Sequence, residues 1–404
     1  MFTENMDTEK MLSLIESADI YEYGVFKESF TAKLNEYKNS GKAKTIIAAI
    51  DNVDTDEMLL EVLYKNSKEV ICGMKAVANI LSISEMVIYL PEGKDDLVKI
   101  VENAAKELNT EILIKTGIVD VREYREAFIT HVETMTAVND VLEGKKADKA
   151  LIQIKEVFGD DTKLSEIKEL EYGKAISDIF DTSKVSIKAV EIGYKLYDKS
   201  ILQQPVTKET VLGTGVITLY DKSCCMVHIS KDLSLKMREH SCGKCTFCRE
   251  GFIQLDMRHG EIVSKKGELD SIGIMKDIGK AMNFSCECSV GTYGANDIVD
   301  ILDKFENEYI SHIKKKDCPE GVCKAFTNIY IDPDKCIGCT KCIKACPIDC
   351  IEGKEGYIHM IEDMDCTKCE ECIKVCPQNA VVITKKRTPS IPNRLTRVGR
   401  FKQY

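Results

Sequence analysis

Three features are scarce or missing in this chain of 404 residues, and each absence excludes a class of protein. The first 20 residues carry acidic side chains and no long apolar run, so we expect neither a secretory signal nor a transmembrane helix, and we place the protein in the cytoplasm. No GxGxxG or Walker-type motif is present, and no Ser-His-Asp or Cys-His arrangement indicates nucleophilic catalysis. Cysteine is nearly absent from the first 223 residues, where Cys72 stands alone and is interpreted as a core residue.

The other eighteen of the 19 cysteines fall between Cys224 and Cys376. Disulfides are not expected in the reducing cytoplasm, so closely spaced cysteines are interpreted as metal ligands. At roughly 150 residues per domain the length predicts two to four domains, and 44% apolar residues are enough for each to bury a core. The net charge of −10 argues against nucleic acid as the main partner.

The first half of the chain alternates short apolar runs with helical patterns. Within residues 1–145 we expect strands and helices that form a doubly wound parallel sheet: strands at Thr45–Ile50, Met86–Leu90 and Glu111–Ile114, and helices at Ile71–Leu81 and Asp95–Leu108. Residues 146–212 predict a small α+β module, with strands at Ala150–Ile154 and Val185–Val190 around a helix at Lys163–Ile179. The chain is therefore predicted to be an α/β and α+β multidomain protein.

The second half is expected to be helical and then duplicated. Residues 213–315 are predicted to form a helical bundle, with the 3.6-residue period at Leu269–Met282 and Ile298–Ile313. Residues 316–328 are a hinge. Residues 329–384 contain two similar halves, Lys335–Ile351 and Asp365–Val381, each a cysteine run followed by a short strand.

The duplicated segment carries the strongest motif, C-x-x-C-x-x-C-x-x-x-C-P, twice. Two-residue gaps let three thiolates of one loop face a common cubane, while the fourth cysteine reaches the other cluster. The predicted ligands are Cys336, Cys339, Cys342 and Cys376 for one 4Fe-4S cluster, and Cys346, Cys366, Cys369 and Cys372 for a second. The segment resembles a bacterial-type two-cluster ferredoxin domain; zinc sites use pairs of cysteines instead of two such triplets. Cys350 lies outside the pattern and is interpreted as a small buried hydrophobe.

A third cluster is predicted in the helical bundle. Cys242, Cys245 and Cys248 lie three residues apart at a helix start, where the helix dipole favours the negative charge of a cubane, and Cys288 is the expected fourth ligand. Cys286 remains the alternative to Cys288.

At this motif a larger family becomes recognisable. The stretch Gly213–Gly291 resembles the C-terminal part of the NADH-oxidising flavoprotein subunit of respiratory complex I and the diaphorase subunit of soluble, electron-bifurcating hydrogenases. The resemblance implies that the Cys242 site receives electrons from a flavin. His131–Thr134 resembles the segment that joins the flavin domain to a ubiquitin-like β-grasp module, which would be residues 146–212. Hydrogenase-type relatives also carry a C-terminal two-cluster ferredoxin domain, as this chain does.

The departures from that family are equally informative. Family members hold FMN with a glycine-rich loop whose backbone amides approach the phosphate. The corresponding segment here, Tyr21–Phe30, has Gly24 as its one glycine, and Asp51–Glu57 replaces an acidic segment with Glu-Pro-Gly. Residues 118–131 are too few for the nicotinamide-contacting insertion. We therefore interpret residues 1–145 as a degenerate flavin-type domain without FMN or NADH; the alternative is an FMN site built from unrelated residues.

The resemblance also implies a structural zinc. Hydrogenase-type relatives have a Cys-Pro-x-x-x-Cys hinge that binds zinc together with another cysteine and a histidine, which here gives Cys225, His312, Cys318 and Cys323. Reduced free thiols are the alternative. The remaining histidines are interpreted as surface or core residues: His131, His228, His240, His259 and His359.

Residues 385–404 form a basic tail without acidic residues, interpreted as a strap across an acidic partner subunit, with nucleic-acid binding as the alternative. Together these features predict an iron–sulfur electron-transfer subunit of a multisubunit oxidoreductase in an anaerobe, whose partners are other subunits or a ferredoxin. The alternative is an FMN-containing subunit that oxidises NAD(P)H. The scarcity of glycine in Tyr21–Phe30 and the absence of the nicotinamide-contacting insertion favour the electron-transfer subunit over the FMN-containing subunit.

Overall fold

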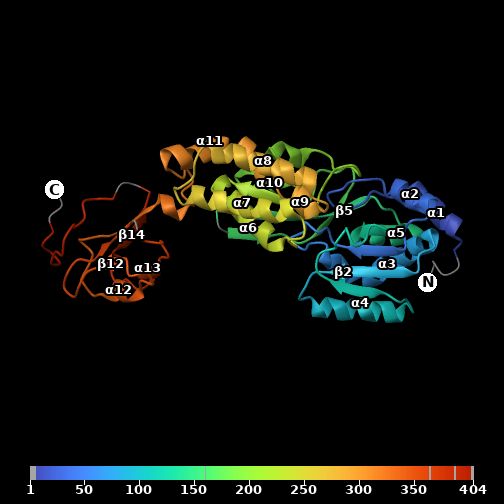
Figure 1. The fold of residues 1–404 in the computed structure, drawn as a ribbon, viewed down its shortest axis with the longest axis horizontal. Helices are drawn as coiled ribbons and strands as arrows, with labels where there is room; N and C mark the ends of the chain where they lie inside the picture. The colour runs from blue at the N-terminus through green and yellow to red at the C-terminus, as the bar shows by residue number, and fades with distance from the viewer. Residues whose placement is uncertain (1–5, 160, 364, 386–387, 402–404) are drawn as a thin grey trace. The chain divides into compact units, whose positions relative to one another are not determined.

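A computed structural model describes residues 6–159, 161–363, 365–385 and 388–401 (Figure 1). The described residues fall into two compact units. The first consists of segments within 1–224, 229–257 and 273–304, and the second of segments within 225–228, 258–272 and 305–404.

The first unit contains the predicted parallel sheet. Its strand order is β3 (Leu113–Thr116), β2 (Glu85–Leu90), β1 (Thr45–Ala49), β4 (Ala127–His131), and every neighbouring pair is parallel. All five residues of β1 are buried, as expected for a central strand with both faces covered. The predicted strands and helices are confirmed, although β3 begins two residues later than expected.

The helices of this region contribute to one core. These are α1 (Thr8–Ala18), α2 (Phe30–Ser40), α3 (Leu60–Leu81), α4 (Asp95–Glu107) and α5 (Val132–Leu142). The core on the other face of the sheet is made of strand residues together with Val119 and Tyr124 from the connection between β3 and β4. That connection is too short for a crossover helix of its own. In the described part of residues 1–145 the helices therefore pack on one face of the sheet. The predicted doubly wound arrangement, with helices on both faces, is wrong, although the predicted parallel sheet is confirmed.

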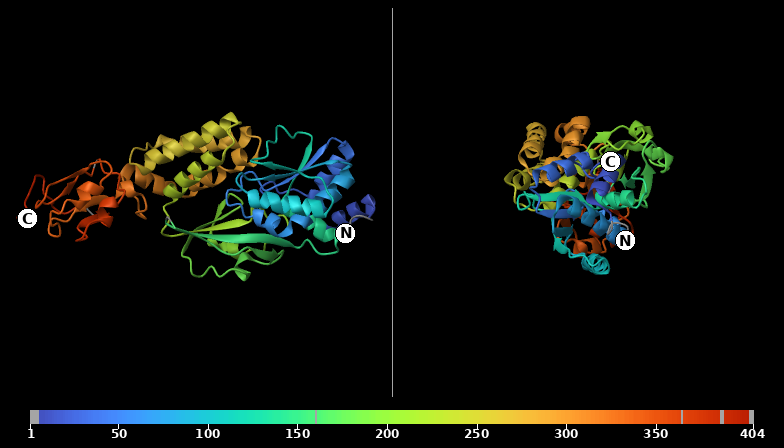
Figure 2. Two further views of the ribbon diagram at one scale, coloured as in Figure 1. Left: turned by 90° about the horizontal axis from the view of Figure 1, so that it is seen from below. Right: turned by 90° about the vertical axis from the view of Figure 1, so that its right-hand side faces the viewer.

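A second sheet follows, with the order β6 (Asp161–Leu164), β5 (Lys149–Phe158), β10 (Val216–Asp221), β8 (Ile187–Ile192), β9 (Leu196–Tyr197). The central strands β5 and β10 are parallel, and the other pairs are antiparallel. Figure 2 shows the long β5 in teal-green. The β-grasp description of this module stays a prediction.

The helix predicted at Lys163–Ile179 is wrong. This stretch instead forms β6, β7 (Lys168–Glu171) and the 3-10 turn η2 (Ile176–Asp178). The ten residues of β5 are enough to pair with both short strands, β7 at its start and β6 at its end. Tertiary pairing thus overrides the local helical pattern. A second 3-10 turn, η3, spans Lys199–Gln203.

The helical region is confirmed from residue 226 onward. Its helices are α6 (Met226–His240), α7 (Thr246–Val263), α8 (Asp270–Ser285), α9 (Ser289–Tyr293), α10 (Asn296–Lys304) and α11 (Glu306–Ile310), followed by a π-helical turn at Ser311–Lys315. The single helix predicted at Ile298–Ile313 is divided at Phe305, whose backbone leaves the helical region. No helix within the described ranges is long and apolar enough to cross a membrane.

The duplicated segment folds as two similar halves. After the 3-10 turn η5 (Lys324–Phe326), β11 (Asn328–Ile331) pairs antiparallel with β14 (Val381–Thr384), and β12 (Ile351–Glu352) pairs with β13 (Met360–Ile361). The short helices α12 (Lys341–Ala345) and α13 (Glu371–Lys374) lie within the two cysteine runs and contain Cys342 and Cys372 (Figure 1).

The two halves also share their backbone strain. Equivalent residues adopt positive φ in both, at Gly338 and Lys368 and again at Thr340 and Glu370. At Gly338 a Cβ atom would lie 2.8 Å from the backbone nitrogen of Gly356, which explains the glycine. The repeat of these unusual angles indicates that both cysteine loops have the same conformation.

Part of the basic tail packs on this segment. Ile358 donates its backbone N–H to Thr396 at 2.9 Å, and Val398 donates to Gly356 at 3.2 Å. The guanidinium of Arg397 lies 5.9 Å from the ring centre of Tyr357. Lys386, Arg387 and Lys402 lie outside the described residues, and the strap across a partner stays a prediction.

Candidate iron–sulfur and metal sites

The first cysteine group lies where α7 begins. Cys242 is exposed and Cys248, in the first turn of α7, is buried. The guanidinium of Arg249 donates to the carbonyl of Gly243 at 3.0 Å, which closes the loop between α6 and α7. The three thiols therefore stand at a helix N-terminus, as the spacing predicts, where the dipole favours negative charge.

Cys288 and Cys286 take different places around this group. Cys288, Cys242 and Cys245 line one cavity of about 30 Å³. Cys286 lies against Cys248, and a hydrogen bond between the two lowers the pKa of Cys248 to about 7. Because Cys288 shares a cavity with two members of the triplet, the geometry favours it as the fourth ligand, and the assignment stays a prediction.

Two basic side chains, Arg122 and Lys244, line this cavity together with the acidic Asp120 and Glu287. The ammonium of Lys244 lies 2.6 Å from a carboxylate oxygen of Asp120, and the guanidinium of Arg122 lies 3.5 Å from the carbonyl oxygen of Lys244. These contacts hold the cysteine loop to the connection between β3 and β4.

In the duplicated segment, four cysteines from both halves line a single cavity. They are Cys336, Cys339 and Cys342 from the first half and Cys376 from the second, which is the set the spacing predicts. His359 lines the same cavity, with Nδ1 3.7 Å from the Sγ of Cys336. Sequence reasoning treated His359 as an ordinary core or surface residue and missed this contact.

The other predicted set also comes together. Burial and the neighbouring Cys366, Cys369 and Cys346 raise the pKa of the Cys372 thiol to about 11. Cys350 is buried as predicted, but its Sγ also lies 3.5 Å from that of Cys346. Burial and hydrogen bonds to Cys346 and Cys366 raise the pKa of Cys350 to about 12, so this thiol stays protonated beside the ligand set.

The four residues predicted to hold zinc form a buried group. One ligand atom from each of Cys225, His312, Cys318 and Cys323 lies within 4.8 Å of all the others. The Sγ of Cys225 is 3.4 Å from Nε2 of His312 and 3.8 Å from the Sγ of Cys323. Nδ1 of His312 lies 2.8 Å from the carbonyl oxygen of Glu308, so it carries the proton and Nε2 faces the thiols as an acceptor.

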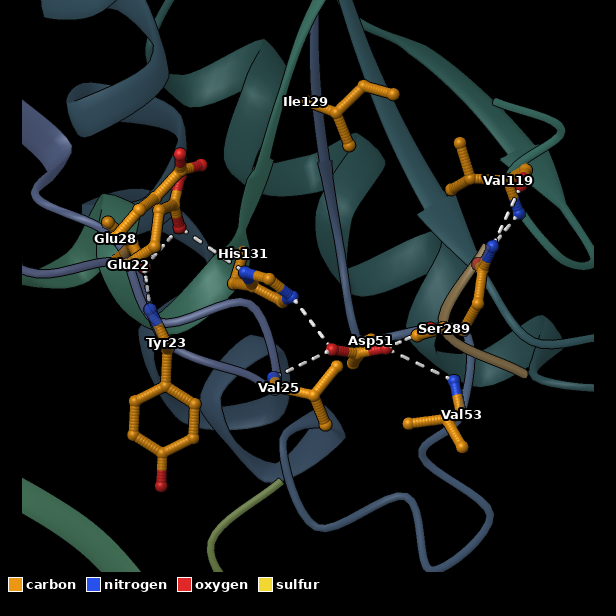
Figure 3. A network of polar contacts seen from close by, with 12 residues as sticks. Glu22, Tyr23, Val25, Glu28, Asp51, Val53, Val119, Ile129, His131 and Ser289 are labelled. Atoms are coloured by element: carbon orange, nitrogen blue, oxygen red, sulfur yellow. Dashed lines mark hydrogen bonds and ion pairs between the residues drawn. The ribbon is translucent and has the colours of Figure 1, made fainter. Parts of the chain in front are cut away.

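A buried ionic network occupies the segment that would correspond to the flavin loop (Figure 3). His131 lies between two carboxylates, 3.2 Å from Glu22 and 3.4 Å from Asp51. Burial alone would lower the pKa of His131, but the hydrogen bonds to Asp51 and Glu22 outweigh it and raise the pKa to about 9. Burial raises the pKa of Glu22, yet Lys33 and His131 together lower it to about 2. His131, Glu22 and Asp51 are therefore all charged at neutral pH.

The network also reaches the first cysteine group. The hydroxyl of Ser289, next to Cys288 in the chain, donates to Asp51, which also accepts from the backbone N–H of Val53 at 3.2 Å (Figure 3). His131 was expected to be structural, and these contacts agree. The sequence pattern does not link His131 to Glu22 and Asp51, because these residues precede it by 109 and 80 positions.

Next to the network, a cleft of about 580 Å³ opens at the carboxyl ends of β1, β2 and β3, and Cys242 lies on its rim. Its lining is strongly acidic: Asp51, Asp54, Glu57, Glu92 and Glu239. Burial and the nearby Asp56 raise the pKa of Asp54 to about 7.

The comparisons with known proteins agree with the two groups of cysteines. Residues 229–312 match the NADH-ubiquinone oxidoreductase-F iron-sulfur binding region, and residues 329–383 match the 4Fe-4S dicluster domain. The two matched regions define an iron–sulfur protein with two kinds of 4Fe-4S binding region.

The individual relatives specify the resemblance further. The chain is 33% identical over 151 residues to the HndC subunit of the NADP-reducing hydrogenase of Solidesulfovibrio fructosivorans, covering 37% of this chain and 31% of the relative. It is 32% identical over 116 residues to the F-type subunit of the NADH-quinone oxidoreductase of Streptomyces coelicolor, covering 29% and 26%. The chain thus spans less than a third of these curated relatives. The predicted resemblance to the F-type subunit and its hydrogenase relatives is confirmed.

The fold is similar over a wider range. A crystal structure of an NAD+-reducing [NiFe]-hydrogenase in the H2-reduced state superposes with a TM-score of 0.65, covering 78% of this chain and 64% of that chain at 15% identity. At this identity the likeness establishes the mixed α/β fold alone.

Proposed function

We propose that the chain is the electron-transfer subunit of a multisubunit oxidoreductase and relays single electrons through three 4Fe-4S clusters. The observation that carries the proposal is the cavity lined by Cys336, Cys339, Cys342 and Cys376, because the crossed use of a cysteine from the other half is characteristic of two-cluster ferredoxins. The other two ligand sets would be Cys346, Cys366, Cys369 and Cys372, and Cys242, Cys245, Cys248 and Cys288.

The clusters supply the one-electron chemistry, and the chain contributes thiolates, N–H donors and burial, which set the potentials. Exposed Cys242 is the point at which the first site approaches solvent. Electrons would pass to or from partner subunits or a ferredoxin. Anaerobic co-purification would identify those partners.

We infer that the chain does not bind FMN. Three backbone amides of the segment corresponding to the flavin loop already have acceptors within the protein: Glu22 donates to Glu28 at 2.9 Å, Tyr23 to Thr134 at 3.0 Å and Val25 to Asp51 at 3.2 Å. A phosphate would have to displace these bonds and stand beside two buried carboxylates.

Gly24 does not provide a phosphate cradle either. Its φ of +93° requires glycine, and a Cβ atom there would lie 2.6 Å from Nε2 of His131 and 2.7 Å from Oδ2 of Asp51. The missing Cβ therefore makes room for the buried ion pair. The carboxylates of Glu57, Glu92 and Glu239 in the adjacent cleft add further repulsion against a phosphate or a dinucleotide.

One observation favours the second candidate, an FMN-containing subunit that oxidises NAD(P)H. The cleft of about 580 Å³ lies at the carboxyl ends of parallel strands and beside a cluster cysteine, a place where α/β proteins bind ligands. Fluorescence of flavin released from the anaerobically purified protein, with NADH-driven dye reduction, separates the candidates. One FMN per chain together with NADH-driven dye reduction would refute the flavin-free proposal.

We further propose that Cys225, His312, Cys318 and Cys323 bind a structural zinc ion. Tetrahedral zinc with bonds of about 2.3 Å to sulfur and about 2.05 Å to nitrogen separates two sulfurs by about 3.8 Å and a sulfur from a nitrogen by about 3.6 Å. The distances of 3.8 Å and 3.4 Å around Cys225 fit this geometry. A disulfide would need about 2.05 Å. Metal analysis of the intact protein should find about twelve irons and one zinc per chain.

A further inference from the structure

His359 is a buried histidine that belongs to none of the proposed ligand sets. It lies between β12 and β13 and is 1% exposed. Its Nδ1 is 3.7 Å from the Sγ of Cys336, and its ring lines the cavity shared by Cys336, Cys339, Cys342 and Cys376. The imidazole therefore closes one side of a proposed cluster site.

The local fold is built to admit this ring. A Cβ atom on Gly353 would lie 2.5 Å from Cδ2 of His359, so a larger residue there would displace the imidazole. On the other side of the chain, the N–H of Ile358 is held by the carbonyl of Thr396 at 2.9 Å. The ring is thus positioned from both directions.

The hydrogen bonds available to His359 determine where its N–H points. Within the described residues, Nε2 is buried without a hydrogen-bond partner, whereas Nδ1 faces Cys336. A buried N–H without an acceptor costs more than a buried lone pair without a donor. The favoured arrangement therefore places hydrogen on Nδ1, where the Cys336 sulfur and the backbone carbonyl of Tyr357 are both acceptors.

The internal repeat shows that this donor belongs to one half alone. The two motifs are offset by 30 positions, as from Cys336 to Cys366, so the residue equivalent to His359 is Ile329. Ile329 is 2% exposed and belongs to the core against which Cys366 packs. An aliphatic side chain thus takes the position where the other half has an N–H donor.

We propose that His359 donates an N–H···S hydrogen bond to Cys336 and thereby raises the reduction potential of the Cys336 cluster. Reduction adds negative charge to the sulfur ligands, and a hydrogen bond to sulfur favours the reduced state. This inference rests on the proposed function, since it requires that both clusters assemble.

The variants His359→Ile and His359→Gln of the full chain test the inference. The first makes the two halves alike and removes the donor, while the second keeps an N–H donor. Ile358→Val is the matched control because it alters packing in the same loop without touching the hydrogen bond. Each protein is purified anaerobically, its iron is counted, and its clusters are titrated with EPR detection.

We expect His359→Ile to shift the distribution of one electron between the two clusters by about tenfold toward the Cys366 cluster, which corresponds to about 59 mV for a one-electron couple. His359→Gln should retain most of the wild-type difference, and Ile358→Val all of it. Unchanged potentials in His359→Ile with full iron content would overturn the inference and leave the proposed function intact. Iron far below twelve per chain in the wild type would instead overturn the proposed function.

A measurement on the unaltered protein covers the case in which His359→Ile does not assemble. Protein labelled with ¹⁵N in histidine alone should show a histidine-nitrogen coupling to the reduced Cys336 cluster in pulsed EPR. Absence of that coupling from a reduced protein with both clusters would also overturn the inference.

Discussion

Replacing His131 by glutamine removes the positive charge that two buried carboxylates share. The side chain of His131 is 17% exposed and those of Glu22 and Asp51 are 1% and 3% exposed, so solvent replaces little of the lost interaction. Raising the pKa of His131 from 6.5 to about 9 corresponds to about 3 kcal/mol in favour of the folded state. This agrees with the roughly 3–5 kcal/mol lost when one member of a buried ion pair is removed.

The loss should depend on pH with a defined sign. Because the folded state raises the pKa of His131, its stabilisation is complete below pH 6.5 and disappears as the pH rises through about 9. The difference between wild type and His131→Gln should therefore be about 3 kcal/mol near pH 6 and about 1 kcal/mol near pH 8. Acidic pH acts in the opposite direction through Glu22, whose stabilisation is lost between its usual pKa and about 2.

Hydrogen exchange of the full-length protein, read by mass spectrometry on peptides that contain β1 and β4, measures this difference. The ratio of protection factors between wild type and variant should be on the order of 100 near pH 6 and about tenfold or less near pH 8. His240→Gln is the control, because His240 contacts a neutral carbonyl, that of Asn52, at 2.7 Å. Its cost should be about 1 kcal/mol at both pH values. A His131→Gln effect that does not change with pH would refute the electrostatic reasoning.

Three further predictions concern the cysteine sites. Cys288→Ser should lose about four irons per chain and Cys286→Ser none, and the reverse result would assign the ligand to Cys286. Cys323→Ser and His312→Gln should each lose one zinc and keep the irons, as metal analysis would reveal; retention of zinc in both would contradict the proposed tetrahedron. Cys350→Ala should keep about twelve irons per chain, because Cys350 lies outside the repeated cysteine motif, whereas a loss of four would make Cys350 a ligand.

Much of the cysteine chemistry could be predicted from the sequence. Only two residues separate Cys336 from Cys339 and Cys339 from Cys342. Local chain geometry alone therefore directs these thiols to one side. The crossed partner Cys376 was predicted from the duplication, and it lines the same cavity. The parallel sheet was also predictable, because β1 and β2 contain continuous apolar runs between helical patterns, although β4 was not predicted.

The local pattern was insufficient where distant residues decide the outcome. The segment Lys163–Ile179 resembles a helix, yet it pairs as two short strands with β5, because β5 is long enough to bind both. The helices of residues 1–145 contribute to a single core because the connection before β4 is too short to form another helix. Neither outcome depends on the composition of the segment itself.

By itself, the sequence determined which cysteines are the predicted cluster ligands and that Tyr21–Phe30, the segment corresponding to the flavin loop of the family, contains one glycine. Only the tertiary structure decided which contacts occupy the place of the glycine-rich loop and which side chains lie beside the predicted ligands. Ser289 and Asp51 are 238 positions apart, and His359 reaches Cys336 from the other half of the repeat. Such contacts depend on how strands and loops from distant parts of the chain come together, because a hydrogen bond acts over about 3 Å and a sequence pattern describes only neighbours along the chain.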